Sequence, residues 1–208
     1  MTKLTPALFE ALTSVISAVR LRMLSGKTPI LVAIDGGSGS GKSTLAVLLS
    51  QILGATLVQS DDFYAAHIPS AEWAKRTPAE KARDCVDWQR LRVEAIAPLL
   101  ARKPARWHPF DFENLRPDGT YPLRTDFVER QPAEVIILDG AYSSRPELAD
   151  LIDLSVLVNV PVNIRHQRLS GREPAEFLES WHARWDASEA YYFTEVRPPA
   201  SFDLIINL

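Results

Sequence analysis

The chain has 208 residues, of which 46% are hydrophobic and 24% charged, a balance typical of a globular protein that buries a sizeable core. Its formal net charge of −3 argues against non-specific binding to nucleic acid or to an anionic membrane surface. A single cysteine, Cys85, excludes an internal disulfide framework and a cysteine-ligated zinc finger. No apolar run approaches the roughly 18 residues of a membrane-spanning helix, and the first residues lack a signal-peptide pattern, so we expect one cytoplasmic domain over residues 1–208.

Short apolar runs alternate with amphipathic segments along the chain. Residues 5–25 predict a helix, with Thr5 as its cap and Pro6 in its first turn. Strands are predicted at 30–34, 55–58, 135–138, 154–158 and 202–206, and helices at 42–53, about 161–170 and 174–193. The first strand is apolar on both faces, which is typical of a parallel sheet. The alternation therefore predicts an α/β fold, in which helices flank a parallel five-stranded sheet.

Residues 65–130 interrupt this alternation, because prolines punctuate them throughout. Pro117-Asp118-Gly119 is a turn signal, and it predicts a hairpin between 107–112 and 120–123. We interpret 65–130 as an insertion packed beside the sheet, where a substrate pocket is expected.

The strongest motif runs from Gly36 to Thr44 and fits the pattern G-x-x-x-x-G-K-[ST] in full. Its glycines let backbone N–H groups approach phosphate oxygens, and the following helix adds its positive dipole end. Lys42 is expected to neutralise the β- and γ-phosphates, and Ser43 to complete a Mg²⁺ shell. Because the motif follows a buried strand and opens an amphipathic helix, a Gly/Ser linker is the weaker interpretation. The predicted nucleotide-binding residues are Gly36, Gly37, Ser38, Gly39, Ser40, Gly41, Lys42, Ser43 and Thr44.

The sequence lacks the characteristic motifs of two other classes of nucleotide-binding protein. The N-K-x-D motif of guanine-specific GTPases is absent from the sequence. Leu169-Ser170-Gly171 is weakly similar to the signature motif of transport ATPases. Those proteins have the motif before the acidic strand, whereas here it follows the strand that ends at Asp139. We treat it as a chance match.

Three further elements follow the phosphate loop in order: Gln59-Ser-Asp-Asp-Phe-Tyr64 after the second strand, Leu138-Asp-Gly140 after an apolar strand, and an arginine-rich segment at about 161–173. Together they resemble the uridine kinase and phosphoribulokinase family, and its relatives that phosphorylate pantothenate and nicotinamide riboside. The resemblance covers residues 30–172, and Pro109-Phe-Asp-Phe112 is similar to the family's substrate-side element. It implies a P-loop NTPase fold and an ATP- and Mg²⁺-dependent kinase, a phosphotransferase with an alcohol group as acceptor.

The resemblance implies that Asp61 is the general base that faces the acceptor hydroxyl. Its position agrees, because an aspartate at the carboxyl end of a strand lies in the crevice where doubly wound sheets bind ligands. Asp62 competes for the role, but neighbours in an extended segment point in opposite directions, so only one can face the phosphates. Asp139 would hold the Mg²⁺ water shell. The family more often has glutamate there, so the shorter aspartate is expected to act through water.

Arg165, Arg168 and Arg172 are spaced by three and four residues, which places them on one face of a helix. A solvated charged surface is one interpretation of this spacing. The family resemblance implies another, a lid over 161–173 that closes over ATP and excludes water. In that interpretation Arg165 and Arg168 stabilise the transferring phosphoryl group, and Arg172 binds the nucleotide.

Candidate substrate residues follow from position alone, and several fit a structural role equally well. Asp84 and Asp87 could begin a helix, and His108 could be a packed loop residue. Trp107, Phe112 and the helically spaced Phe177, Trp181, Trp185 and Tyr192 are assigned to the core. His67, His166 and His182 show no metal-ligand spacing. The candidate substrate-binding residues are Asp62, Tyr64, Arg83, Asp84, Asp87, His108, Phe110, Asp111 and Tyr142.

A nucleoside is the favoured small-molecule acceptor, with pantothenate, a sugar or a riboside as alternatives. A nucleotide-dependent regulator or assembly factor, which binds ATP and hydrolyses it slowly, is the alternative of another class. Such a protein needs neither an acid at the end of the second strand nor an aromatic, acid-rich insertion, and this chain has both. The sequence determines neither the identity of the acceptor nor whether the chain forms a homo-oligomer.

Overall fold

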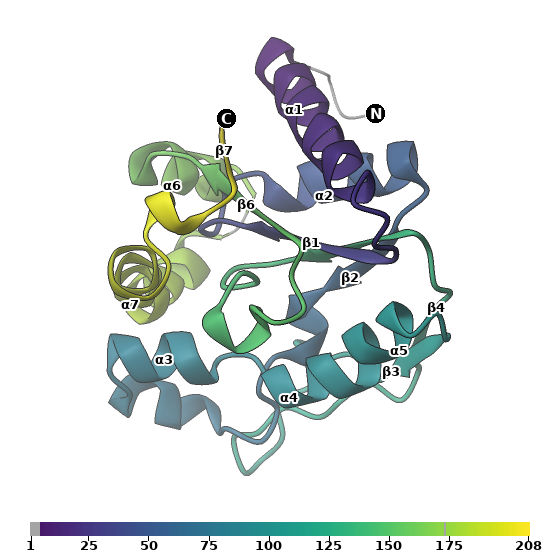
Figure 1. Cartoon of the computed structure of the whole chain (residues 1–208). Coiled ribbons are helices and arrows are strands. Elements are labelled where there is room, and N and C mark those ends of the chain that lie inside the picture. Colours follow the sequence, from purple (N-terminus) through teal and green to yellow (C-terminus); the bar gives the residue numbers. More distant parts are fainter. Residues whose placement is uncertain (1–4, 173) are drawn as a thin grey trace.

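The computed structural model describes residues 5–172 and 174–208, and its centre is the predicted parallel sheet of five strands (Figure 1). The strands lie in the order β2-β5-β1-β6-β7. The predicted fold class is therefore confirmed, although the last strand begins at Leu204, two residues later than expected. The five strands of the sheet are β1 (Ile30–Asp35), β2 (Thr56–Gln59), β5 (Val135–Asp139), β6 (Leu154–Asn159) and β7 (Leu204–Asn207).

β1 occupies the middle of the sheet and is buried at every position. It pairs in parallel with β5 on one side and β6 on the other, so both of its faces are covered. This explains its unbroken apolar sequence. Asp139 of β5 lies opposite Ile34 of β1 and Gln59 of β2 in the strand register, so three strands end level with one another.

Helices cover both faces of the sheet (Figure 1). α1 (Pro6–Met23) and α2 (Lys42–Leu53) pack on one face, where they meet Ile30, Val32 and Ile34. As predicted, the Thr5 side chain caps α1 by accepting a hydrogen bond from the Leu8 N–H. α6 (Val162–Ser170) follows β6, and α7 (Ala175–Tyr191) continues as a π-helical turn, Tyr192–Val196. No helix in the described ranges combines the length and apolarity needed to cross a membrane.

The segment 65–130 lies on the other face of the sheet, where short elements contribute to a second core together with α7. α3 packs against α7, and the Lys81 ammonium donates to the Arg184 carbonyl. The helical elements of this segment are α3 (Pro78–Asp84), α4 (Trp88–Arg90), the π-helical Leu91–Ile96 and α5 (Ala97–Leu100). Short 3₁₀ turns span Ser60–Phe63, Ser70–Lys75, Pro146–Leu148 and Pro199–Ser201.

The predicted hairpin between 107–112 and 120–123 is confirmed only in part. β3 (Ala105–Trp107) pairs antiparallel with β4 (Val128–Arg130), so the two strands begin farther from the turn than expected. Of the expected pairing, the structure keeps an isolated antiparallel bridge between Phe110 and Leu123, and the Asp111 N–H donates to the Pro122 carbonyl. Three prolines between the two strands, Pro109, Pro117 and Pro122, lack the N–H that a continuous ladder requires.

Candidate active site

The loop between β1 and α2 wraps its backbone around a space at the carboxyl edge of the sheet. Gly41, at the start of α2, has a φ of +91°, and Gly39 has a φ of +79°, both in the left-handed region that favours glycine. At Gly39 a side chain would also collide with the Arg165 carbonyl, because a Cβ atom would lie 2.7 Å from that oxygen. Glycine is therefore required here for the loop to turn and to pack against α6.

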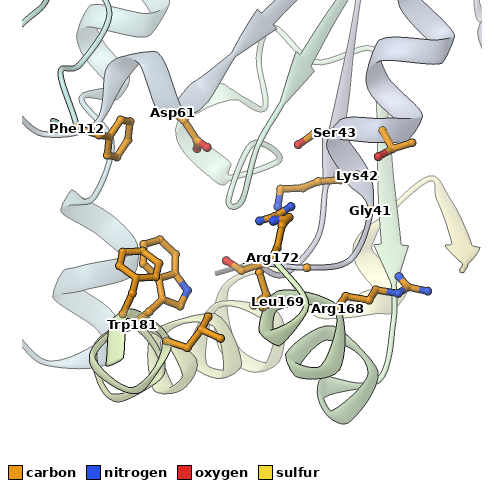
Figure 2. Close-up of a pocket in the computed structure, with 14 residues that line it drawn as sticks. Gly41, Lys42, Ser43, Asp61, Phe112, Arg168, Leu169, Arg172 and Trp181 are labelled. Atoms are coloured by element: carbon orange, nitrogen blue, oxygen red, sulfur yellow. The ribbon is translucent and has the colours of Figure 1, made fainter. Parts of the chain in front are cut away.

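A cavity of about 540 Å³ opens in front of this loop (Figure 2). Lys42 and Ser43 face it from the start of α2, and Asp61 points into it from across the cavity. The cavity's size, its lysine and the helix that begins at its wall suit a nucleotide triphosphate group. Its lining is Ser38, Gly39, Gly41, Lys42, Ser43, Thr44, Asp61, Phe112, Arg168, Leu169, Arg172, Phe177, Leu178 and Trp181.

Asp139 is buried next to the start of α2, and one of its oxygens, Oδ1, has no hydrogen-bond partner in the described part of the chain. Burial raises the pKa of this carboxyl to about 6, against the lowering effects of the Lys42 ammonium and the Ser43 hydroxyl. A buried carboxylate oxygen without a partner, beside a hydroxyl, is a donor set that fits Mg²⁺. Ser43 and Asp139 are the residues that could hold the ion.

Asp61 and Asp62 follow β2 in the 3₁₀ turn, and their carboxylates have different surroundings. Asp61 lines the cavity in front of the phosphate loop. The Asp62 carboxylate accepts a hydrogen bond of 2.8 Å from Nε1 of Trp107, and burial raises its pKa. Of the two acids, Asp61 therefore faces the space where phosphates would lie, and Asp62 is held against the insertion.

The three arginines of the predicted lid do not share one environment. Arg168 and Arg172 line the cavity, and Nη1 of Arg168 donates to the Ser40 carbonyl at 3.1 Å. Arg165 is buried and donates to the Ser38 carbonyl and to Glu189, so it does not line the cavity. Arg168 and Arg172 therefore belong to the cavity, whereas Arg165 holds the phosphate loop in place.

Glu189 of α7 is a site residue that the sequence reasoning missed. Its Oε1 accepts from the N–H and the hydroxyl of Ser38, at 2.8 and 2.6 Å, and its Oε2 lies 2.7 Å from Nη1 of Arg165. Its side chain is 4% exposed and that of Arg165 11%, so the pair is shielded from water. The only signal in the sequence is an acid among the aromatic residues of a helix, which does not reveal its partners.

We expect Glu189→Gln to lower the free energy of unfolding by about 2 kcal/mol, because hydrogen bonds to a buried charge are worth roughly 1.5–3 kcal/mol and Arg165 would lose its counter-charge. Urea unfolding of the two proteins measures the difference. Glu176→Gln, an exposed glutamate on the same helix, is the matched control. Equal losses in both variants would show that the buried pair contributes nothing.

Asp35, the last residue of β1, is a second residue that the sequence reasoning missed. It is completely buried, and burial raises its pKa. Its two oxygens accept from the N–H groups of Gly36, Tyr142 and Ser144 and from the Tyr192 hydroxyl, at 2.7–2.9 Å. This one carboxylate therefore joins the phosphate loop, the segment after β5 and the end of α7.

A second cavity, of about 110 Å³, adjoins the first and shares Ser38, Lys42, Asp61, Phe112 and Trp181 with it. Its other lining residues are Tyr64, Cys85, Val86, Ala141, Tyr142, Trp185 and Glu189. A third, of about 420 Å³, continues from Tyr64 and Trp185 toward Phe110, Tyr121 and Arg184. Aromatic rings therefore surround the space that leads away from Asp61.

The assignment of Phe112 and the whole aromatic stripe of α7 to the core is wrong in part. Trp185 and Tyr192 are buried as expected, but Phe112 is 57% exposed and Phe177 is 47% exposed. Both line the cavity in front of the phosphate loop, as Trp181 does. Helical spacing identifies an apolar face, but it does not show whether packed side chains or a cavity cover that face.

Three candidate substrate residues, Tyr64, Phe110 and Tyr142, line the aromatic cavities. Five other candidate substrate residues do not line either of the two cavities that contain Asp61. Instead, Arg83 and Asp84 form an ion pair, Asp87 caps α4, the His108 ring contacts the Arg124 and Asp126 carbonyls, and Asp111 accepts from the N–H groups of Glu113 and Asn114.

No protein-family model matches the sequence. The chain is similar to the uridine kinase of Geobacillus kaustophilus, with 30% identity over 182 residues that cover 83% of this chain and 79% of the relative. It is also similar to the uridine kinase of Lactiplantibacillus plantarum, with 29% identity over 161 residues, or 72% of this chain and 70% of the relative.

Two solved structures share the fold over most of their length. A D-glycerate 3-kinase from Cryptococcus neoformans superposes with a TM-score of 0.66 and 15% identity, covering 98% of this chain and 96% of the other. A possible uridine kinase from Bacillus stearothermophilus gives a TM-score of 0.61 and 21% identity, covering 91% and 99%. At these identities the superpositions show a common architecture.

Proposed function

This chain belongs to the uridine kinase family, and from that premise we propose that it transfers the γ-phosphoryl group of ATP to a hydroxyl group of a small molecule, with a nucleoside as the acceptor. The observation that carries the proposal is the pair of adjoining cavities. The phosphate loop borders the first, aromatic rings border the second, and Lys42 and Asp61 belong to both. Direct transfer requires two binding spaces that meet at the reacting groups.

On the nucleotide side, the loop amides and Lys42 hold the phosphates in the proposed reaction, and Arg168 and Arg172 contribute positive charge from the other wall. Ser43 and Asp139 would hold Mg²⁺, which would offset charge on the phosphate oxygens. Asp61 accepts the proton of the acceptor hydroxyl as its oxygen attacks the γ-phosphorus in line with the leaving ADP. Most of the rate enhancement then comes from positioning and electrostatics.

On the acceptor side, the flat rings of Tyr64, Phe112, Trp181 and Trp185 support a ligand with a planar, weakly polar body, as in a nucleoside base. Arg184 lines the outer part of this space and supports a second candidate, an acidic acceptor such as pantothenate. The two candidates differ in charge, which makes them separable by assay.

The deciding experiment offers Mg²⁺-ATP with uridine, cytidine, pantothenate, nicotinamide riboside and simple sugars, and detects phosphorylated products by mass spectrometry. We expect a nucleoside monophosphate, and no product from Lys42→Ala. Phosphorylation of pantothenate alone would favour the acidic acceptor. ATP hydrolysis without any phosphorylated acceptor, together with nucleotide-dependent capture of a partner protein, would favour the regulatory NTPase.

Phe112→Ala is expected to raise the KM for the acceptor about three- to tenfold, because an aromatic contact is worth about 0.5–1.5 kcal/mol. The ring is 57% exposed, so the free energy of unfolding should change by no more than about 0.5 kcal/mol. Phe127→Ala is the matched control, since Phe127 is 43% exposed and its ring lies over the Arg106 guanidinium, outside these cavities. An equal rise in KM for both variants would argue against a direct contact.

A further inference from the structure

Three potential metal ligands lie together between α6 and α7, outside the cavities that contain Asp61. His166 comes from α6, while His182 and Asp186 lie one turn apart on α7. Nε2 of His166 is 3.1 Å from Oδ2 of Asp186, and Nδ1 of His182 is 3.0 Å from Oδ1 of the same carboxylate. The two imidazole centroids are 3.8 Å apart. The phosphoryl transfer proposed above uses none of the three.

The spacing of these groups suits a small tetrahedral ion. One ligand atom from each residue lies within 4.8 Å of the other two. Bonds of about 2.0–2.1 Å in a tetrahedral site place ligand atoms about 3.3 Å apart, so small rotations of these side chains would complete the geometry. Two imidazoles and one carboxylate favour Zn²⁺ over the oxygen-preferring Mg²⁺ and Ca²⁺.

The surroundings of the three side chains agree with an ion-binding role. Nε2 of His166 is buried, and its 3.1 Å contact with Oδ2 of Asp186 lacks hydrogen-bond geometry, so the atom makes no hydrogen bond among the described residues. The side chains of His166, His182 and Asp186 are 35%, 23% and 37% exposed, so an ion could enter and a water molecule could complete its shell. His166 lies on a different helix from the H-x-x-x-D pair of α7, so the spacing of the histidines alone does not reveal the cluster.

We propose that His166, His182 and Asp186 form a Zn²⁺ site with three protein ligands and one open position, which joins α6 to α7. Asp186 lies one turn before Glu189, whose ion pair with Arg165 connects the same two helices. A bound ion would therefore strengthen a junction that already holds the phosphate loop. Any effect on nucleotide affinity rests on the proposed kinase function, whereas the metal site itself does not.

The test uses the full chain without an affinity tag, freed of metal by a chelator and kept without nucleotide, because ATP binds Zn²⁺. Calorimetric titration is expected to give one Zn²⁺ per chain, and saturating Zn²⁺ to raise the Tm. Co²⁺ in its place should give the visible absorption of a four- or five-coordinate ion. His166→Gln, His182→Gln and Asp186→Asn should each weaken Zn²⁺ binding by more than about tenfold, since even outer-shell changes cost about 10–100-fold.

His67→Gln, at an exposed histidine outside the cluster, is the control and should bind Zn²⁺ as the parent chain does. Circular dichroism and nucleotide titration confirm that each variant is folded. Zn²⁺ binding that persists unchanged in all three ligand variants would overturn the site. So would an unaltered chain that shows neither saturable Zn²⁺ binding nor the Co²⁺ absorption, a result that does not depend on any variant folding and leaves the kinase assay unaffected.

Discussion

Asp61→Asn is expected to lower kcat by about 10²–10⁴-fold and to leave nucleotide affinity within a few-fold of the parent value. The amide has the size of the carboxylate but cannot accept the proton of an attacking hydroxyl. Asp61 lies where the nucleotide cavity and the aromatic cavity meet, so its loss affects the transfer step and not the phosphate-binding loop. Product formation under saturating substrates measures kcat, and fluorescence titration measures nucleotide binding.

Asp62→Asn is the matched control, because it alters the adjacent carboxylate in the same way. The Asp62 oxygen that accepts from Trp107 has an equivalent in asparagine, so the hydrogen bond of 2.8 Å can be kept. We expect the kcat of this variant to stay within a few-fold of the parent value. A large loss in Asp62→Asn beside a nearly normal Asp61→Asn would show that the base has been assigned to the wrong acid.

Asp139→Asn should stabilise the protein at pH 8, in the absence of Mg²⁺ and nucleotide, by about 3 kcal/mol. Burial raises the pKa of Asp139 from its ordinary 3.8 to about 6. Between these two pH values the folded chain keeps a proton that the unfolded chain has released, so this group favours folding below pH 3.8 and loses that contribution as the pH rises through 6. This difference of about 2 pH units corresponds to about 3 kcal/mol.

Urea unfolding at several pH values between 5 and 8 measures this gain. It should be about half as large at pH 5 as at pH 8, and constant above about pH 7. Asp111→Asn is a control of opposite sign, because the Asn114 amide and the Glu113 N–H lower the pKa of that exposed carboxyl, which therefore stabilises the folded chain at neutral pH. A gain in Asp139→Asn that does not vary with pH would contradict the assigned cause.

Features of the fold that depend on neighbouring residues were predictable. The apolar run before Gly36 and the motif that begins there lie within about fifteen residues, so the strand, the loop and the following helix could all be expected from local sequence. The position of Asp61 was predictable for the same reason, since it directly follows a strand.

Residues held by distant parts of the chain could not be predicted in this way. Asp35 bonds to donors 107 and 157 positions away, and Ser38 meets Glu189 across 151 positions. Arg165 had the spacing of a lid arginine, but the helix places it against Glu189, and spacing alone does not fix which partner a guanidinium meets. Phe112 was misassigned because hydrophobicity predicts burial only where other side chains are available to cover the residue.

The Glu189 carboxylate, shared between Ser38 and Arg165, restricts how the site can open. If α6 moved outward, Arg165 would move away from Glu189. The Glu189 carboxylate would then be a buried charge without its counter-charge, which is strongly unfavourable. We therefore expect the phosphate loop and α6 to move together, because buried contacts join them. We therefore expect the cavity to open on its other side, at the segment around Phe112, whose side chain is 57% exposed.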